Sequence, residues 1–365
     1  MKLSLLSAAL AFAPAVLAGS SKHRELNYTS VAGVFLQDDT STDASSFDYA
    51  NWNFGLLNRT YPSDAKKVRG QWPKGYRTQW ERFGKYVDYL NSKASKDTEY
   101  KVLVMGRHGE GWHNAAETYY GTPAWNCYWS LQTGNGTATW QDSLLTDAGM
   151  KEAYKAKAYF KSRFEEQGMP YFESYYTSPL ARCVITAKAT FGDLDLPHSH
   201  RFYPTVKEYF RESISIHTCD HRSNKTYIRS LNPRSTFESH FPELDKLWTG
   251  TKGETTEAQL ARSKTVLDDV FTNDGNTWIS ITSHSGEISK LLTTLNHRTF
   301  KLSTGQIIPV LVKAQRIAQE PTSTYASWST EVTCHAPPVT SISGSGCVCS
   351  SSTTLASVLA TATSV

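Results

Sequence analysis

The chain has 365 residues and a net charge of +4, with 39% hydrophobic and 20% charged residues. This composition is typical of a globular protein, and the length suffices for one large domain or two ordinary ones. The positive charge is spread along the sequence without a basic run, which argues against a nucleic-acid partner. No stretch beyond the N-terminal segment is long and apolar enough for a transmembrane helix, so we expect no membrane partner.

The first 18 residues predict a secretory signal peptide. Lys2 precedes an apolar run from Leu3 to Leu17, and Val16-Leu-Ala18 has the small-residue pattern of a cleavage site. Four Asn-x-Thr triplets follow, and they predict exposed, glycosylated asparagines at Asn27, Asn58, Asn135 and Asn224. We therefore expect a secreted, extracellular glycoprotein.

Six cysteines are present in a chain that is expected to enter an oxidising compartment. Six cysteines can pair in fifteen ways, so the sequence leaves the connectivity open. Cys183 and Cys219 are candidate buried thiols, whereas Cys347 and Cys349 are too close together to pair comfortably with each other. No Cys or His cluster has zinc spacing, and we expect neither a metal nor a cofactor.

The N-terminal half predicts an arm followed by the start of the main domain. Residues 19–75 are polar and loop-rich, with a candidate short strand at 31–36, and predict an arm packed on the domain of residues 76–330. Apolar residues at helical spacing predict a helix at 76–90. The apolar run 101–105 predicts a buried strand ending in Arg107-His-Gly109. Residues 110–143, rich in Trp, Gly, Tyr and Asn, predict a long ordered loop near the site.

Strands and helices then alternate. The predicted elements are a helix at 147–167 with Thr146 as N-cap, a strand at 171–177, a helix at 179–191, a strand at 203–210, a loop or lid at 211–238, a helix at 256–271, a strand at 277–283, a helix at 287–295, and a strand at 306–312 that Pro309 places at a sheet edge. This alternation predicts an α/β fold, a three-layer sandwich whose mostly parallel central sheet is flanked by helices.

The C-terminal segment changes character. Residues 331–365 become rich in Ser and Thr, which predicts a disordered tail. The final apolar stretch is short and broken by Thr, which argues against a lipid-anchor signal.

Two of the predicted strands end in histidine, at His108 and His284. The carboxyl ends of parallel strands meet at one edge of a sheet, which is the usual place for a site. Ser178-Pro-Leu-Ala-Arg182 puts an arginine on the first turn of a helix at the same edge, and helix N-termini attract anions. A single His or Arg of this kind is as readily structural, so the signal lies in their combination.

These residue types suit phosphoryl transfer without a metal. Arg107 and Arg182 can neutralise phosphoryl oxygens with bidentate geometry that Lys cannot provide, and Asn114 can donate a further hydrogen bond. A neutral His108 can attack phosphorus and form a phosphohistidine, while His284 would hold the equatorial oxygens.

The departing alkoxide needs a proton, and a carboxylic acid can supply it. Glu212 is the leading candidate because it directly follows a predicted strand and opens the lid segment. Glu208, Glu110 and Asp220 are the alternatives.

Three further residues are candidates for contact with substrate. His113 either orients the nucleophile loop or fills space at the surface. His217 and Arg222, together with Asp220, either bind the substrate beyond its phosphate or hold the lid together through their own ion pair. The tryptophans of residues 110–143 are interpreted as core residues in preference to the lining of a substrate entrance.

The ordered motifs resemble those of the histidine phosphatase superfamily, in its phosphoglycerate mutase-like branch. The motifs are Arg107-His-Gly with Asn114, Leu145-Thr-x-x-Gly149, Ser178-Pro-Leu-x-Arg182, Arg211-Glu212 and Ser283-His-Ser-Gly286. Gly33–Asp39 and Thr218–Arg222 are similar to segments of fungal phosphomutase-like phosphatases, and the resemblance covers about residues 28–315. It implies a phosphoglycerate mutase-like fold and a small phosphorylated substrate.

The resemblance also implies roles for individual residues. His108 would be the nucleophile, Glu212 the proton donor and His284 the second catalytic histidine. Arg107, Arg182 and Asn114 would bind phosphate.

The sequence departs from the mutases of the family in two respects. Those mutases have Trp-Asn close behind Glu-Ser, whereas this chain has Glu110-Gly-Trp-His-Asn114, and the segments that close over a mutase substrate are not evident. We therefore expect a secreted, metal-independent histidine acid phosphatase, a phosphoric monoester hydrolase. The alternatives are a phosphoglycerate mutase or sugar-bisphosphatase, and a non-catalytic secreted protein that binds phosphorylated ligands.

Overall fold

The computed structural model describes residues 24–66, 78–318, 327–338, 347 and 349. Its strands are β1 (Arg24–Ser30), β2 (Thr98–Arg107), β3 (Ser174–Thr177), β4 (Thr205–Val206), β5 (Thr236–Phe237), β6 (Lys252–Glu254), β7 (Trp278–Ser283), β8 (Ile307–Ala318) and β9 (Trp328–Thr330). Its α-helices are α1 (Gln79–Lys93), α2 (Trp112–Tyr120), α3 (Thr122–Cys127), α4 (Asp147–Gln167), α5 (Ala181–Phe191), α6 (Lys225–Leu231), α7 (Thr256–Asn273) and α8 (Ser285–Thr294). The expected signal peptide and most of the expected tail lie outside these residues.

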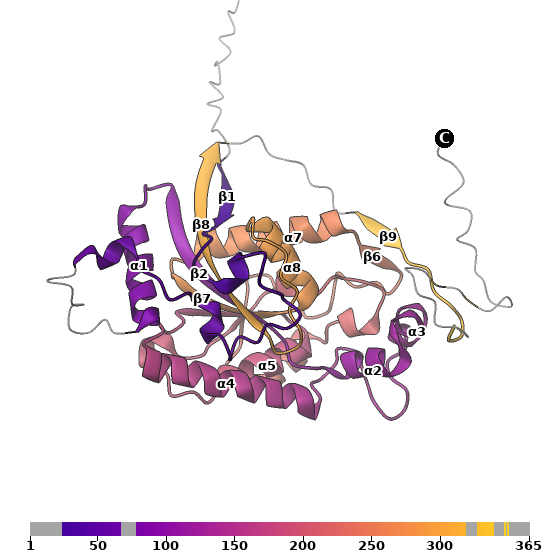
Figure 1. Cartoon of the computed structure of the whole chain (residues 1–365). Helices are drawn as coiled ribbons and strands as arrows, with labels where there is room; N and C mark the ends of the chain where they lie inside the picture. Colours follow the sequence, from indigo (N-terminus) through magenta and orange to yellow (C-terminus); the bar gives the residue numbers. More distant parts are fainter. Residues whose placement is uncertain (1–23, 67–77, 319–326, 339–346, 348, 350–365) are drawn as a thin grey trace, which may run out of the picture.

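In the described part of the chain, a seven-stranded sheet has the order β1-β8-β2-β7-β3-β4-β5. Neighbouring strands from β2 to β5 run parallel, while β8 is antiparallel to both β2 and β1. Figure 1 shows α4 and α5 on one side of the sheet and α7 and α8 on the other. The prediction of an α/β fold with a mostly parallel sheet flanked by helices is therefore confirmed.

The two central strands are buried because helices cover both faces of the sheet. Val102–Met105 of β2 and all six residues of β7 are buried, the continuous pattern typical of a doubly covered parallel strand. Thr146 caps α4 as predicted, with its hydroxyl accepting a hydrogen bond from the Gly149 N–H. These elements give the site a rigid base.

The prediction that the last strand lies at a sheet edge is wrong. β8 lies between β1 and β2, and Pro309 is opposite Val104. In an antiparallel ladder, hydrogen-bonded and non-hydrogen-bonded pairs alternate. Arg107 and Gln306 form a hydrogen-bonded pair, because the Arg107 N–H donates to Gln306 O. Pro309, three residues further along β8, is therefore in a non-hydrogen-bonded pair, and its backbone nitrogen faces away from β2. On its other side β1 pairs only from Val312 onward, so the missing N–H of Pro309 interrupts neither ladder.

Other differences from the predicted elements are local. The N-terminal strand is β1 and not residues 31–36, because the Asp38 carboxylate accepts from the Val34 and Phe35 N–H groups and folds that segment into a 3-10 turn. The strand expected at 203–210 is reduced to β4 followed by the 3-10 helix Glu208–Phe210. The long loop at 110–143 contains α2 and α3, and the loop at 211–238 contains α6 and β5.

Residues 24–66 pack on the same core as the rest of the chain. Tyr28, Phe35 and Phe54 are buried in one cluster with the strands of the central sheet. The Arg298 guanidinium also donates to carbonyl oxygens of Gln37 and Asp39. This N-terminal segment therefore contributes both a sheet strand and core side chains.

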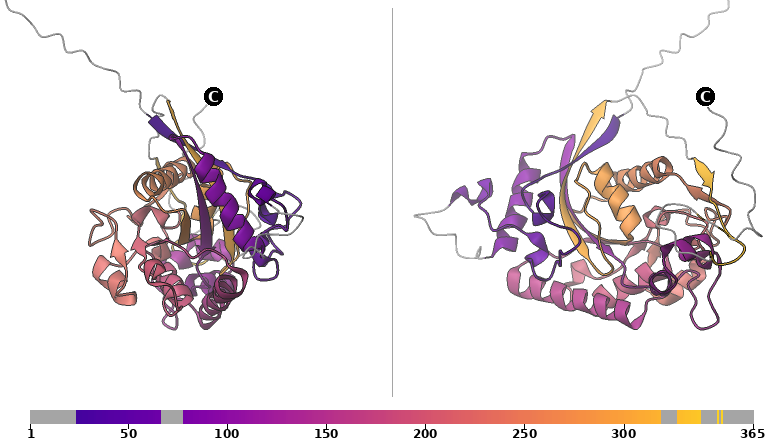
Figure 2. Two further views of the ribbon diagram at one scale, coloured as in Figure 1. Left: turned by 90° about the vertical axis from the view of Figure 1, so that its left-hand side faces the viewer. Right: turned by 45° about the vertical axis from the view of Figure 1, so that its right-hand side comes forward.

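Of the two disulfides, one joins cysteines 220 residues apart and the other joins cysteines 15 residues apart. Cys127 at the end of α3 is bonded to Cys347, and Cys334 is bonded to Cys349. Cys183 and Cys219 are buried free thiols, so both expectations for the cysteines are confirmed. Figure 2 shows β9, just before Cys334, beside β6, with which it pairs.

The four candidate glycosylation sites are all exposed: Asn27 on the edge strand β1, Asn58, Asn135 and Asn224. None of the helices that the structure describes combines the length and apolar character needed to cross a bilayer.

Candidate active site

The two strand-terminal histidines lie side by side. β2 and β7 are parallel neighbours with Arg107 opposite Ser283, so the next residue of each strand, His108 and His284, leaves the sheet at the same edge. The His108 N–H donates to Ser283 O at 3.0 Å, and the two ring centroids are 5.0 Å apart. Both side chains are buried, at 1% and 0% exposure.

The ring of His108 is oriented by its own loop. Its Nδ1 lies 2.7 Å from Gly109 O, and because a carbonyl can only accept, Nδ1 carries the proton. Nε2 therefore keeps its lone pair. The backbone is fixed on both sides, because Gly305 N–H donates to His108 O and Gly109 N–H donates to the Thr186 hydroxyl on α5.

The glycines of two motifs pack against each other. A Cβ on Gly109 would lie 2.3 Å from Gly149 O, and one on Gly149 would lie 2.1 Å from Glu110 O. The nucleophile loop therefore rests directly on the first turn of α4, which any side chain at either position would prevent. This close approach explains why Leu145-Thr-x-x-Gly149 accompanies Arg107-His-Gly109.

Arg182 is buried in the second position of α5. Its Nη1 donates to Cys219 O at 2.7 Å and its Nε donates to His284 Nδ1 at 3.3 Å, while Nη2 lies 3.7 Å from Asp220 Oδ1. The guanidinium therefore sits against His284 with its charge partly balanced. The placement at the shared sheet edge is the predicted one.

Arg107 is the second cation of the site. Its Nη1 donates to Leu302 O at 3.0 Å, whereas Nε is buried without a partner among the described residues. Burial lowers the pKa of Arg107, and the carboxylate of Glu212 opposes that shift. A buried N–H without an acceptor is what a bound oxyanion would satisfy.

Three imidazoles are held in the neutral form. Burial, and next the positive charge of Arg182, hold the pKa values of His108, His113 and His284 well below the usual range. A neutral His108 has the free lone pair that a nucleophile needs.

His284 has partners for both ring nitrogens. Because Arg182 donates to Nδ1, Nε2 carries the proton and donates to Ser178 Oγ at 2.8 Å. The Cys183 thiol lies 3.3 Å from Nε2, and burial raises its pKa, so it remains a neutral neighbour. Ser178 and Cys183 were not among the predicted site residues, although Ser178 opens the motif that carries Arg182.

Glu212 is anchored at the N-terminus of α8. Its carboxylate accepts from the Gly286 N–H at 3.2 Å, the Glu287 N–H at 3.0 Å and the Ser213 N–H at 3.0 Å. A Cβ on Gly286 would lie 2.2 Å from Glu212 Oε1, so the glycine allows this approach. Glu212 is thus tied to the helix that directly follows His284.

The alternative acids have other partners. Glu208 is buried between Arg211 and Arg222, which both donate to its carboxylate. Glu110 accepts from the Thr146 hydroxyl at 2.6 Å. Asp220 accepts from Ser215 and faces Arg182. Of these four carboxylates, Glu212 alone is among the charges that shift the pKa of Arg107, so it is the strongest candidate acid.

Asn114 and His113 lie on the first turn of α2. Asn114 Oδ1 accepts from the Gly111 N–H at 3.0 Å and so caps the start of the helix. The His113 ring centroid is 5.4 Å from that of His108. The structure thus places His113 beside the nucleophile and not at the surface.

Arg222 lies away from this cluster. It donates to both oxygens of Glu208 and to the carbonyls of Ser223, Pro242 and Leu244. All three of its side-chain nitrogens are engaged, which contradicts a substrate-binding role. The segment that follows Glu212 is therefore held by an ion pair between Arg222 and Glu208, and not by the expected ion pair between Arg222 and Asp220.

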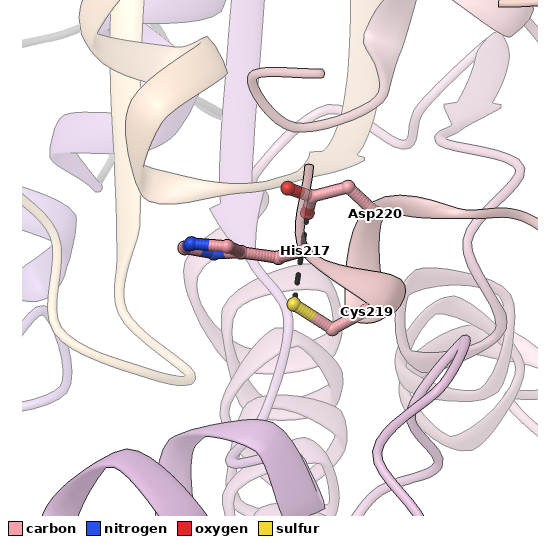
Figure 3. Close-up of side chains that lie close together, drawn as sticks. All are labelled: His217, Cys219 and Asp220. Atoms are coloured by element: carbon pink, nitrogen blue, oxygen red, sulfur yellow. Dashed lines mark hydrogen bonds between the residues drawn. The ribbon is translucent and has the colours of Figure 1, made fainter. Parts of the chain in front are cut away.

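His217, Cys219 and Asp220 are grouped on one turn, with His217 directed to one side (Figure 3). Their potential ligand atoms lie within 4.8 Å of one another. A cation there would face Arg182 across Asp220, and burial raises the pKa of the Cys219 thiol well above its usual range. Both effects oppose metal binding, and Cys219 O and the Asp220 carboxylate instead contact Arg182, while the His217 ring lies 6.3 Å from that of Trp125.

Residues 103–306 match the model of the histidine phosphatase superfamily, branch 1. The "probable phosphoglycerate mutase" of Arthroderma benhamiae is 43% identical over 296 residues, covering 81% of this chain and 87% of the relative. "Phosphomutase-like protein 3" of Candida albicans is 31% identical over 323 residues, covering 87% and 89%.

Among solved structures, phosphoglycerate mutase from Bacillus anthracis is similar over 62% of this chain and 94% of its own, with 16% identity and a TM-score of 0.38. The matched residues 103–306 begin within β2, before His108, and extend past His284. From the family match and the two sequence relatives, the chain belongs to the histidine phosphatase superfamily.

Proposed function

We propose that this chain is a secreted phosphomonoesterase that works through a phosphohistidine on His108. The observation that carries the proposal is the fixed orientation of His108: Nδ1 is bound to Gly109 O, which leaves Nε2 free beside the buried Arg182 and the half-buried Arg107. Membership of the family supports a phosphatase or mutase. The acid phosphatase subtype is our proposal.

In the first step, Nε2 of His108 attacks phosphorus and a P–N bond forms as the bond to the ester oxygen breaks. Arg107, Arg182 and Asn114 hold the non-bridging oxygens, where the charge must be neutralised. Glu212 donates its proton to the departing alkoxide. In the ligand-free site His284 donates to Ser178, a neutral hydroxyl that a phosphoryl oxygen can replace.

In the second step, water attacks the phosphohistidine. Glu212 takes a proton from the water as the P–N bond breaks, which releases phosphate and restores His108. The charge of the transferring group is balanced throughout by guanidinium groups, so the proposed chemistry needs no metal ion.

The same proposal covers the setting in which the protein acts. Two disulfides among the described residues fit an oxidising compartment, and the four asparagines of the glycosylation triplets are exposed. The sequence of residues 1–18 supplies the expected secretory signal. The proposed substrate is a small phosphorylated molecule in the extracellular medium.

The decisive test compares His108→Ala with the wild-type protein on a generic aryl phosphate, with and without a chelator. We expect the variant to lose turnover, and the wild type to be indifferent to chelation and to form an acid-labile, base-stable phosphoenzyme. His198→Ala is the matched control, since His198 is exposed and lies outside the site. Full activity of His108→Ala, or abolition of wild-type activity by the chelator, would exclude the mechanism.

A phosphoglycerate mutase is the second candidate, because a relative that is 43% identical carries that name. The two activities share the phosphohistidine and differ in its acceptor, a second substrate oxygen or water. Phosphorus NMR of a phosphoglycerate mixture separates them. Free phosphate supports the phosphatase, and conversion between phosphoglycerate isomers without phosphate release supports the mutase.

A further inference from the structure

We propose that His113 is a further catalytic residue, whose imidazole donates a hydrogen bond to a non-bridging oxygen of the phosphoryl group that is transferred to His108. This inference rests on the proposed function and adds a residue to its chemistry. It is carried by the position of the ring, by a buried nitrogen without a partner and by the way the ring is held.

The ring of His113 lies at the reacting centre. Its centroid is 5.4 Å from that of His108, and the two planes are inclined by 50°. The side chain is 9% exposed, so it is part of the wall of the site and not of the solvent-exposed rim. A phosphoryl group bonded to His108 Nε2 would have its oxygens within reach of a ring at this distance.

Nδ1 of His113 is buried and has no hydrogen-bond partner among the described residues. Roughly 90% or more of buried polar groups in native structures have one, so such an atom calls for an explanation. After burial, the charges that lower the pKa of this ring include those of Arg182 and Arg107, the two cations assigned to the phosphate. A phosphoryl oxygen held by these arginines would be the missing acceptor.

The backbone holds the ring in this place before any ligand arrives. The His113 N–H donates to Ser143 Oγ at 3.1 Å. A Cβ on Gly111 would lie 2.6 Å from His113 Nδ1, so the ring packs directly on a glycine backbone. Since none of the described groups bonds to Nδ1, the ligand can determine which nitrogen carries the proton.

The experiment replaces His113 by Phe, Asn and Gln. Phe keeps a ring of similar shape without a donor, whereas the amide of Asn places an N–H near the position of Nδ1 and that of Gln near Nε2. Each variant is assayed for kcat/KM on an aryl phosphate and titrated with vanadate, which mimics the five-coordinate transition state, and with inorganic phosphate. His198→Phe is the matched control.

We expect His113→Phe to lose about 100-fold in kcat/KM, the usual effect of removing one donor to a developing oxyanion. Vanadate binding should weaken by a similar factor and phosphate binding by less, while Asn or Gln should recover at least about tenfold of the loss. Recovery by one amide identifies the donating nitrogen.

Two outcomes would overturn the inference. In the first, His113→Phe keeps both kcat/KM and vanadate affinity within about threefold of the wild type. In the second, all three variants lose activity equally with vanadate affinity unchanged, which would reduce His113 to a packing residue. If the wild type hydrolyses no ester, the proposed function fails, but calorimetric vanadate titration of the same variants still decides the role of His113.

Discussion

Replacing Gly286 by Ala should displace Glu212, the proposed proton donor, and leave the other residues of the site in place. The new methyl group would lie 2.2 Å from Glu212 Oε1 and 3.0 Å from its Cδ. An ordinary carbon–oxygen contact is about 3.4 Å or longer, so the carboxylate must retreat by about 1 Å. It would then lose its hydrogen bonds from the Gly286 and Glu287 N–H groups, at 3.2 and 3.0 Å.

The cost to stability should be small, because the displaced atom is the end of a flexible side chain. Losing two hydrogen bonds costs about 1 kcal/mol each, and Ala in place of Gly in a helix returns up to about 1 kcal/mol. The cost to catalysis should be larger. A misplacement of about 1 Å can reduce a rate by about 100-fold, or roughly 2.7 kcal/mol in activation free energy.

The loss should depend on the leaving group. Glycerol phosphate releases a basic alkoxide that needs the proton, whereas p-nitrophenyl phosphate releases a stable phenolate. We expect kcat/KM of Gly286→Ala to fall by about 100-fold on the alkyl ester and by less than about fivefold on the aryl ester, with Glu212→Gln showing the same selectivity. Gly275→Ala is the control, since a Cβ there meets no atom within 4 Å. Equal losses on both esters would assign the acid role to another residue.

Three more predictions concern charge and stability. Arg182→Lys keeps the charge but loses the guanidinium fork that reaches Cys219 O and His284, so kcat/KM should fall by about 100-fold or more. A loss below threefold would exclude Arg182 as a phosphate ligand. Reduction of Cys127–Cys347, which spans 220 residues, should lower the free energy of unfolding by up to about 5 kcal/mol in the chain-entropy model. Urea unfolding with and without reductant measures this change, and an unchanged unfolding midpoint would contradict the prediction. Because the folded-state pKa of His113 lies below that of the unfolded chain, its contribution to stability is complete above about pH 6.5 and is lost as pH falls toward the folded pKa, by about 1.4 kcal/mol per pH unit. Urea unfolding at pH 7.5 and 5.5 should therefore show a smaller decline for His113→Phe than for the wild type, and equal declines would refute the argument.

The parts of the site that sequence could predict are those fixed by local pattern and sheet geometry. His108 and His284 each follow an apolar run that predicts a strand. Because parallel strands bring their carboxyl ends to one edge of a sheet, the sequence alone predicts that the two histidines are adjacent. The same reasoning placed Arg182 there, because its helix follows a third parallel strand. What could not be derived is how each side chain is held, since Ser178 and Gly286 act through tertiary contacts, and Gly109 O acts through the conformation of its loop.

The strand pairings that were mispredicted have a different cause. Pro309 lacks the N–H that a neighbouring strand would bind on one side of β8. That side faces β1, and the pairing of β1 with β8 ends at Val312, before Pro309, so the missing N–H does not make β8 an edge strand. The helices α2 and α3 formed in a segment whose Trp and Gly content gave no clear period. The disulfide between Cys127 and Cys347 joins segments whose proximity no local pattern records.

The charges around His108 couple the protonation states of the three imidazoles to the binding of a phosphorylated substrate. Burial and the field of Arg182 keep His108, His113 and His284 neutral, beside guanidinium charges that Asp220 and Glu212 only partly balance. A bound phosphate dianion offsets the same arginine charges, which raises the proton affinity of the neighbouring rings. In the proposed mechanism Nε2 of His108 bonds to phosphorus, so His113 and His284 are the rings that can gain a proton as negative charge builds on the oxygens. Burial and the two arginines thus keep His108 unprotonated before binding, and the charge of the phosphate favours protonation of its neighbours after it.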